Sequence, residues 1–394
     1  MESAIKTVRL HKGKERSLKL MHPWVFSGAV RSVDTSIREG DIVEVISSVG
    51  EFLGIGHYHE GSIKVRIFSF EQTPVSQSFW NDKFLKALRL RKNLDLIGNT
   101  ETTCYRLVHG EGDGMPGLIV DIYGKAAVIQ AHTVGMHALV DNFSEALKVT
   151  YGENLTVIYD KSAETLGKNR APESTNRFLF GDEGQITIKE SGISYNIDII
   201  EGQKTGFFLD QRENRNLLRR YSKGKSLLNT FCYSGGFSLA ALAGGAETVV
   251  SIDSSSKATS LASSNTALNH FEKHDILTED VFDFLKKDKR KFDMVVLDPP
   301  AFAKHLSSVD NAVIGYRNLN TLGFSKVNDG GLLFTYSCSQ VVDKQLFRKV
   351  VFQAAAQSGR NVRILHQLSQ SPDHPVSIYH PEGEYLKGLV LYVD

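Results

Sequence analysis

Cys338 is the residue whose type and position best suit covalent chemistry. It lies in residues 334–339 (FTYSCS), at the end of an apolar run that predicts a β-strand. A thiolate is a good nucleophile that can later be eliminated. Free cysteine is otherwise often a small buried apolar side chain. We interpret Cys338 as a nucleophile because of this strand-end position and because Asp298 ends another predicted strand.

Asp298 opens the segment 298–300, which reads DPP. Two prolines remove two backbone donors and fix the local dihedral angles, so they hold Asp298 rigidly. A rigid carboxylate suits recognition of an amino or imino group on a flat ring, and it can stabilise an adduct. Ligands of open α/β sheets bind beyond the carboxyl ends of the strands. We therefore expect Asp298 and Cys338 to open onto one crevice.

A thiolate beside a rigid carboxylate matches the chemistry of a pyrimidine ring. Carbon 5 of cytosine is a poor nucleophile until a group adds to carbon 6, and a thiolate is suited to that addition. Carbon 5 can then accept a methyl group from a sulfonium before a base removes its proton and the thiolate leaves. An unperturbed thiol has a pKa of about 8.5, so it needs an activating group at neutral pH.

A glycine-containing loop follows the first predicted strand of the same region, at residues 229–238 (NTFCYSGGFS). Adjacent glycines allow a sharp turn and a close approach of the backbone to a ligand. Their spacing differs from the dinucleotide-binding fingerprint. The loop residues that we expect at a cofactor are Phe231, Tyr233, Ser234, Gly235 and Gly236.

Acidic residues follow the next two predicted strands. Asp253 could accept hydrogen bonds from both hydroxyls of a ribose, which dinucleotide-dependent and methyl-donor enzymes share. Asp280 could receive the amino group of adenine, with a helix N-cap as an equally good alternative. Asp298 with Pro299 completes this predicted cofactor site.

Alternating strands and helices must position these residues. Apolar runs at 226–229, 248–253, 292–298 and 331–336 are separated by helical stretches. This order predicts βαβ units and a mostly parallel sheet over residues 191–394. Residues 386–393 predict a last strand.

Two smaller regions precede this one. Residues 1–73 contain short alternating runs at 41–46, 51–56 and 62–68, which predict a small β-barrel or sandwich. Residues 74–190 predict an α+β unit. Its expected elements are a basic amphipathic helix over 78–96, a helix over 136–150, and strands at 126–131 and 155–160.

Composition limits the class of protein. The 394 residues carry 46 basic and 45 acidic side chains, so the global charge does not indicate a nucleic-acid partner. Three widely spaced cysteines match no zinc spacing and favour the reducing cytoplasm, and we expect no metal site. No signal peptide or membrane span is expected. The first 20 residues hold a local basic excess: Lys6, Arg9, Lys12, Lys14, Arg16 and Lys19.

Several segments together resemble the 23S ribosomal RNA cytosine-5 methyltransferases of the large ribosomal subunit, and the resemblance covers essentially the whole chain. The segments are 22–28 (HPWVFSG), 105–121, 204–212 (KTGFFLDQR), 229–237, 298–300, 337–339 and 381–388 (PEGEYLKG). Each is modest alone, and the set is highly specific.

The resemblance implies a PUA-like RNA-binding barrel (1–73), a central α+β domain (74–190), and a Rossmann-like class I methyltransferase domain with a seven-stranded mostly parallel sheet (191–394). It implies S-adenosylmethionine as cofactor. It also implies that residues 204–212 help to bind that cofactor, through Lys204, Thr205, Gly206, Phe208, Asp210, Gln211 and Arg212.

The implied partner is 23S ribosomal RNA, naked or within a partly assembled subunit, and the resemblance leans towards a homodimer. The basic N-terminal side chains could then contact phosphates, and Trp24 could stack on a base, although we favour a place in the barrel core. The target base must leave its stack to be modified. Family members often have Lys-Phe after the two prolines. Here Ala301 and Phe302 follow, with a lysine at Lys304, which leaves the RNA contact at this point open.

Four alternatives remain. A guanine methyltransferase of the same RNA would share the KTGF-like and DPP segments but would not need Cys338. A uracil-5 methyltransferase also uses a thiolate. A non-catalytic RNA-binding assembly factor would bind the methyl donor without transferring it. A small-molecule methyltransferase fits poorly with two additional N-terminal domains.

Overall fold

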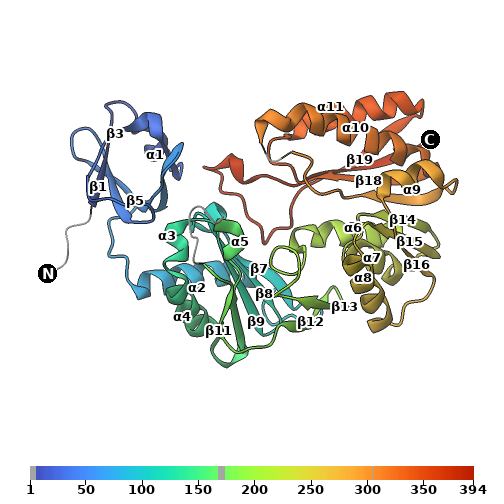
Figure 1. The fold of residues 1–394 in the computed structure, drawn as a ribbon, viewed down its shortest axis with the longest axis horizontal. Helices are drawn as coiled ribbons and strands as arrows, with labels where there is room; N and C mark the ends of the chain where they lie inside the picture. Colours follow the sequence, from blue (N-terminus) through green and yellow to red (C-terminus); the bar gives the residue numbers. More distant parts are fainter. Residues whose placement is uncertain (1–5, 167–173, 304) are drawn as a thin grey trace. The chain divides into compact units, whose positions relative to one another are not determined.

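A computed structural model describes residues 6–166, 174–303 and 305–394, so Lys304 lies outside the described residues (Figure 1). The chain forms two compact units. The first, unit 1, comprises Met1–Ile188, Ile197–Phe207 and Pro372–Gly383. The second, unit 2, comprises Lys189–Asn196, Phe208–Ser371 and Glu384–Asp394.

Unit 1 begins with a six-stranded sheet in the order β2-β6-β5-β4-β1-β3. Its elements are β1 (Lys6–Leu10), α1 (Arg16–Lys19), β2 (Trp24–Phe26), β3 (Val30–Val33), β4 (Ile42–Ile46), β5 (Phe52–Tyr58) and β6 (Ile63–Ser69). Alternate residues such as Val43 and Val45 are fully buried, and they form the core of this small β domain. The strands predicted at 41–46, 51–56 and 62–68 are thus confirmed.

The rest of unit 1 is a five-stranded sheet, in the order β11-β10-β9-β8-β7, with helices packed against it. Its strands are β7 (Cys104–His109), β8 (Leu118–Tyr123), β9 (Ala126–Ala131), β10 (Val157–Asp160) and β11 (Arg177–Phe180). Its helices are α2 (Gln77–Asn93), α3 (Val134–His137), α4 (Val140–Tyr151) and α5 (Ala163–Leu166). The rings of Trp80 and Phe84 on α2 pack against Phe143 on α4.

One predicted helix differs from the structure. The helix expected over 136–150 is two helices, α3 and α4, because Leu139 has non-helical backbone angles between them. The first of them begins earlier than expected because the hydroxyl of Thr133 caps it by accepting from the amide of Met136.

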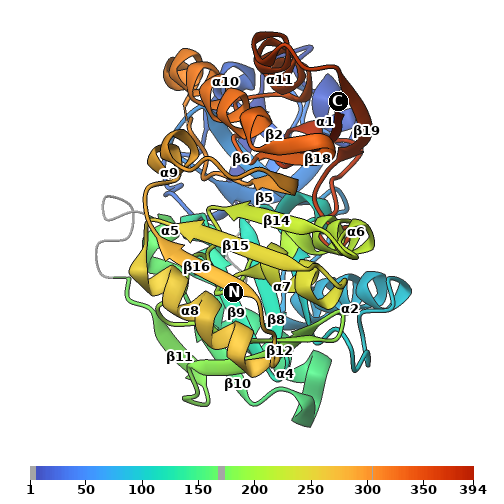
Figure 2. The same cartoon turned by 90° about the vertical axis from the view of Figure 1, so that its right-hand side faces the viewer.

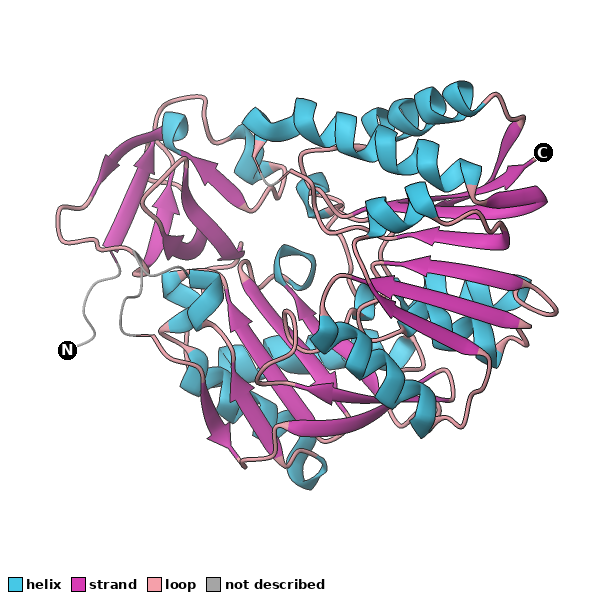
Figure 3. Cartoon of the chain, turned by 45° about the vertical axis from the view of Figure 1, so that its right-hand side comes forward, coloured by secondary structure: helices cyan, strands magenta, loops and turns pink. Residues whose placement is uncertain are grey.

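Unit 2 contains a seven-stranded sheet in the order β16-β15-β14-β17-β18-β20-β19 (Figure 3). Its strands are β14 (Ser226–Thr230), β15 (Thr248–Asp253), β16 (His274–Thr278), β17 (Phe292–Leu297), β18 (Val327–Ser337), β19 (Val362–Leu368) and β20 (Lys387–Val393). The strands from β14 to β18 pair in parallel, and β20 lies antiparallel between β18 and β19. In Figure 2, β14, β15 and β16 lie side by side. The mostly parallel sheet of the prediction is confirmed.

Helices cover both faces of this sheet. They are α6 (Arg212–Tyr221), α7 (Gly236–Ala243), α8 (Ser256–Leu268), α9 (Val281–Lys287), α10 (Val309–Ser325) and α11 (Lys344–Ser358). Neighbouring strand residues belong to different cores: Leu227 packs with α6 and α7, whereas Leu228 packs with α9, α10 and α11. Because side chains alternate along a strand, a sheet buried on both faces needs continuous apolar runs, as the sequence shows.

A two-stranded sheet, β12 (Gln185–Glu190) with β13 (Ile193–Asp198), includes residues of both units. In the described part of the chain, no helix combines the length and the apolar character needed to cross a membrane.

Candidate active site and cofactor site

The loop between β14 and α7 has a strained backbone. Phe231 and Tyr233 have positive φ angles of 54° and 45°, and Gly235 has φ 82°. A non-glycine residue in this region costs on the order of 1–3 kcal/mol, and such strain concentrates at ligand sites. At Gly235 a Cβ would also lie 2.9 Å from a methyl group of Leu239. The loop predicted to hold the cofactor therefore has a conformation that its packing enforces.

Asp253 ends β15 beside this loop. One carboxylate oxygen accepts from the amide of Tyr233 and the other from the amide of Ser255, each at 3.0 Å. The side chain is half-buried, and each carboxylate oxygen can accept a further hydrogen bond. The carboxylate is thus fixed in orientation and suited to the two hydroxyls of a ribose.

Asp280 caps a helix. Its carboxylate accepts from the amide of Asp283 at 3.0 Å, as the N-cap residue of α9, and its side chain is exposed. This is the alternative role that the sequence allowed. Because the cap uses one oxygen, contact of the other with adenine stays a prediction.

Gln211 joins the segment before α6 to the end of β17. Its side-chain amide donates to Asp298 at 3.0 Å, and its carbonyl oxygen accepts from Asn214 at 2.6 Å. All three side chains belong to unit 2. The structure therefore brings together two of the predicted cofactor segments, 208–212 and 298–300.

A buried ion pair holds this segment in place. The guanidinium of Arg215 donates to both carboxylate oxygens of Glu190, at 2.6 and 2.8 Å, and to the carbonyl of Phe208 at 2.9 Å. The ring of Phe208 then meets that of Tyr233 edge-on, with centroids 5.3 Å apart. Glu190 raises the pKa of Arg215 against the opposing effect of burial, so the arginine stays charged.

The remaining residues of 204–212 differ in surroundings. Asp210 is buried, and its carboxylate accepts from the hydroxyl of Tyr385 at 2.7 Å. Arg212 is also buried. By contrast, Lys204, Thr205 and Gly206 belong to unit 1, and contact of these three with the cofactor stays a prediction.

Thr205 already has partners within unit 1. Its hydroxyl lies 2.6 Å from the carboxylate of Asp121 and 2.8 Å from the hydroxyl of Tyr123, and its side chain is fully buried. These contacts attach the segment before α6 to the five-stranded sheet.

The three cysteines have different surroundings. Cys104 is fully buried. Cys232 is buried too, and its burial, with the nearby charge of Asp253, raises the pKa of its thiol to about 12. Cys338 alone of the three is partly exposed. Only a thiolate attacks readily, and burial in apolar surroundings disfavours the thiolate. The partly exposed Cys338 is therefore the candidate nucleophile.

Cys338 lies next to the predicted carboxylate. Its thiol is 3.9 Å from the carbonyl oxygen of Pro299, the residue after Asp298. Pairing of Leu297 with Thr335 in neighbouring strands produces this proximity. The two strand ends are therefore adjacent, as the expectation of one crevice requires.

Sequence reasoning gave no role to one buried residue beside Cys338. The ammonium group of Lys387 donates to the carbonyls of Ser339, at 2.6 Å, and Tyr385, at 2.7 Å. The side chain is buried, which lowers its pKa to about 8, and the negative charge of a Cys338 thiolate opposes this shift. The signals in the sequence are its place in the segment 381–388, which carries part of the family resemblance, and its position at the start of an apolar strand.

The basic N-terminal side chains separate into two groups. Lys6 pairs with Asp41 and Lys19 with Glu51, and Arg9 donates to backbone carbonyls. The exposed side chains of Lys12, Lys14 and Arg16 remain the better candidates for phosphate contacts.

Trp24 does not belong to the buried barrel core. It is half-buried; its indole N–H donates to Glu111 at 2.8 Å, and the guanidinium of Arg66 lies 4.8 Å from its ring centroid. The ring of His380 packs against it with centroids 4.4 Å apart. The expected place in the core was wrong, because polar partners hold the indole at the edge of the sheet.

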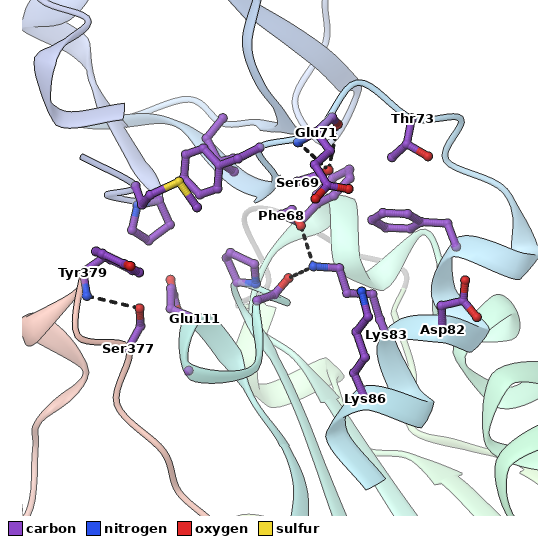
Figure 4. A pocket seen from close by; sticks show the side chains of 18 residues that line it. Phe68, Ser69, Glu71, Thr73, Asp82, Lys83, Lys86, Glu111, Ser377 and Tyr379 are labelled. Carbon is purple, nitrogen blue, oxygen red and sulfur yellow. Dashed lines mark hydrogen bonds between the residues drawn. The ribbon is translucent and has the colours of Figure 1, made fainter. Parts of the chain in front are cut away.

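Unit 1 also has a pocket of about 440 Å³, lined by residues of β6, α2, the turn after β7 and the segment 377–379 (Figure 4). In it, Lys83 donates to the carbonyls of Phe68 and Gly114, at 2.7 and 3.1 Å, and Glu111 accepts from Arg66 and Trp24. These polar groups already have protein partners. Since Asp298 and Cys338 belong to unit 2, we do not assign this pocket to their chemistry.

Across residues 6–166, 174–303 and 305–394, no group of His, Cys, Asp and Glu side chains is arranged to hold a metal ion.

Family models and relatives agree on the type of protein. Residues 154–381 match the S-adenosylmethionine-dependent methyltransferase family, and residues 8–70 match a PUA-like domain. A ribosomal RNA large subunit methyltransferase I from Photobacterium profundum is 38% identical over 98% of this chain and 99% of its own length. The protein of that name from Escherichia coli O139:H28 is 36% identical over 98% of each chain.

Solved structures agree with the fold. A Streptococcus mutans chain assigned to the SAM-dependent methyltransferases has a TM-score of 0.84 at 24% identity, over 98% of this chain and all of its own. Another structure, of a methyltransferase complexed with SAH, has a TM-score of 0.85 at 25% identity over the same shares.

The residues of this chain fit S-adenosylmethionine. The fixed carboxylate of Asp253 suits its ribose, and the left-handed loop at 231–235 lies directly beside that carboxylate. The chain has the PUA-like domain and the class I methyltransferase fold, and its cofactor is S-adenosylmethionine. The chain therefore belongs to the S-adenosylmethionine-dependent methyltransferases, within the family of ribosomal RNA large subunit methyltransferase I.

Proposed function

We propose that this protein methylates carbon 5 of a cytosine in 23S ribosomal RNA, through a covalent adduct between Cys338 and carbon 6 of the base. The supporting observation is the partly exposed thiol of Cys338, 3.9 Å from the carbonyl of Pro299 and thus next to Asp298. The names of the relatives supply the ribosomal RNA substrate. Such a substrate also accords with the cytoplasmic location expected from the cysteine content.

The chemistry follows from the residues at the two strand ends. The Cys338 thiolate adds to carbon 6, so electron density moves to carbon 5. When bound, S-adenosylmethionine supplies an electrophilic methyl group that carbon 5 accepts. Loss of the carbon-5 proton to a base then drives elimination of the thiolate and restores the ring.

Asp298 would hold the base during these steps. Its carboxylate is fixed by the amide of Gln211 and by the prolines that follow it. We assign to it a hydrogen bond to the cytosine: as a carboxylate it accepts from the amino group, and in its protonated form it donates to N3, where negative charge develops when the thiolate adds. Uracil presents a carbonyl acceptor in place of that amino group, so a carboxylate that accepts a hydrogen bond at this point favours cytosine.

Trapping of the adduct tests the mechanism. Ribosomal RNA containing 5-fluorocytidine has no proton to lose at carbon 5, so elimination stops and the RNA should stay bonded to the protein. We expect a denaturation-resistant adduct at Cys338 that requires S-adenosylmethionine, and no adduct with Cys338→Ser. An adduct at another residue would contradict the proposed mechanism. So would the absence of an adduct when the protein methylates the same RNA without the fluorine.

We also propose that the predicted domains end at residues 73 and 190, and that the chain forms a homodimer. Light scattering of the purified chain would measure the oligomeric state directly, and a monomer would exclude the dimer.

A further inference from the structure

We propose that Lys387 is the positioning residue that activates Cys338, by placing an ammonium group beside the thiol and so stabilising its thiolate. This inference deepens the proposed function and rests on it in assigning Cys338 as the nucleophile.

The strand order brings Lys387 close to Cys338. β20 pairs antiparallel with β18, and Ser337 is opposite Lys387 in the last pair of that ladder. The lysine side chain, 6% exposed, reaches the carbonyl of Ser339 at 2.6 Å. Its ammonium group is thus hydrogen-bonded to the residue that directly follows Cys338.

The anchoring leaves the ammonium with capacity for one more interaction. Lysine has three N–H donors, and the carbonyls of Ser339 and Tyr385 take two of them. Neutral carbonyls do not compensate the charge of a buried lysine, whereas a neighbouring thiolate would. The charge of Cys338 is the strongest influence that favours the charged form of Lys387.

Other charged groups near Lys387 contribute less. Asp343 and Glu384 favour its charged form and Lys344 opposes it. Lys344 and Glu384 pair with each other at 2.7 Å, and Asp343 caps α11 through the amide of Leu346.

The neighbours of Cys338 increase the need for a cation. Burial raises the pKa of Tyr316, so its hydroxyl, bonded to Ser339, stays neutral. The carboxylate of Asp298, one residue from the Pro299 carbonyl that the thiol contacts, opposes a thiolate. Lys387 would offset that repulsion.

The direction of the pH effect follows. A cation beside a thiol lowers the pKa of the thiol, so more thiolate forms near neutral pH. Replacing Lys387 by an uncharged residue should raise the midpoint of Cys338 ionisation. A rise of about one pH unit would lower the thiolate fraction at pH 7 roughly tenfold.

The experiment measures alkylation of Cys338 by iodoacetamide between pH 5 and 10, on the full chain without RNA or cofactor, with mass spectrometry of the peptide that contains it. We expect Lys387→Met to raise the midpoint by about one unit and Lys387→Arg to restore it largely. Lys326→Met is the matched control: Lys326 is another buried lysine of unit 2 bonded to a carbonyl, that of Asp288, and its loss should leave the midpoint unchanged.

An unchanged midpoint in folded Lys387→Met would overturn the inference. If that variant does not fold, the reciprocal measurement decides: NMR titration of Lys387 in Cys338→Ser should show a lower lysine pKa than in the unaltered chain, and an equal pKa would overturn the inference. Methyl transfer assayed with the same variants separates the two proposals. A shifted midpoint in a protein that makes no 5-methylcytidine would support the role of Lys387 while refuting the proposed function.

Discussion

At the scale of single residues, burial separates the three cysteines more clearly than their positions in the sequence do. The raised pKa of Cys232 keeps it a thiol at neutral pH, although it lies in the cofactor loop. Cys338 is partly exposed beside the strand end that carries Asp298. The sequence could identify Cys338 as a candidate because strand ends share one edge of the sheet. It could not assign a role to Lys387, although Lys387 lies in the segment 381–388, because its proximity to Cys338 depends on the antiparallel insertion of β20.

Asp253 gives a residue-scale prediction about the cofactor. Asp253→Asn removes a charged acceptor that we place at the ribose, so the Kd for S-adenosylmethionine should rise roughly tenfold to a hundredfold, since hydrogen bonds to charged groups contribute about 1.5–3 kcal/mol. Isothermal titration calorimetry would measure this. Asp275→Asn, an exposed carboxylate in the next strand, is the control and should bind as the unaltered chain does. Equal affinities for both variants would refute the ribose contact.

At the scale of elements, the periodic segments were predictable and the irregular ones were not. The apolar runs of β14, β15, β17 and β18 are buried on both faces, so each stands out in the sequence. The edge strand β19 is mostly exposed and gives no comparable signal. The break between α3 and α4 was missed because the apolar residues continue across it with helical spacing.

The N-cap of α9 gives an element-scale prediction. Asp280→Ala should lower the free energy of unfolding by about 1 kcal/mol, because the amide of Asp283 loses its acceptor. Asp280→Asn should keep most of that stability, because asparagine also caps helices. Urea denaturation of both variants would measure this. Equal stabilities for the alanine and asparagine variants would show that the cap contributes little. If Asp280 also receives adenine, the alanine variant should bind S-adenosylmethionine more weakly as well.

At the scale of the whole molecule, a PUA-like domain and a methyltransferase fold in one chain suit an RNA substrate. The resemblance of the motifs identified both domains. Unit 1 includes Ile197–Phe207 and Pro372–Gly383, which lie far along the chain from its other residues. These segments join unit 1 through contacts between residues far apart in the sequence, for example between Thr205 and Asp121. No local pattern in the sequence indicates such contacts.

Binding of RNA gives the prediction for the whole molecule. Changing Lys12, Lys14 and Arg16 together to glutamine should weaken binding of ribosomal RNA and reduce the slope of log K against log salt by about 2 to 3, if each side chain neutralises one phosphate. Filter binding over a range of salt concentrations would measure this. The control changes the exposed Lys286, Lys287 and Lys289 of unit 2 to glutamine, with equal loss of charge. Equal slopes for the two triple variants would argue against RNA contact by the N-terminal barrel.

Identification of the methylated nucleoside tests the central claim most directly. The full chain would be incubated with isotopically labelled S-adenosylmethionine and ribosomal RNA, the RNA digested to nucleosides, and the labelled nucleoside identified, with Cys338→Ala assayed in parallel. We predict label in 5-methylcytidine that disappears with Cys338→Ala. Label in a methylguanosine or a methyluridine, or undiminished transfer without Cys338, would contradict the account.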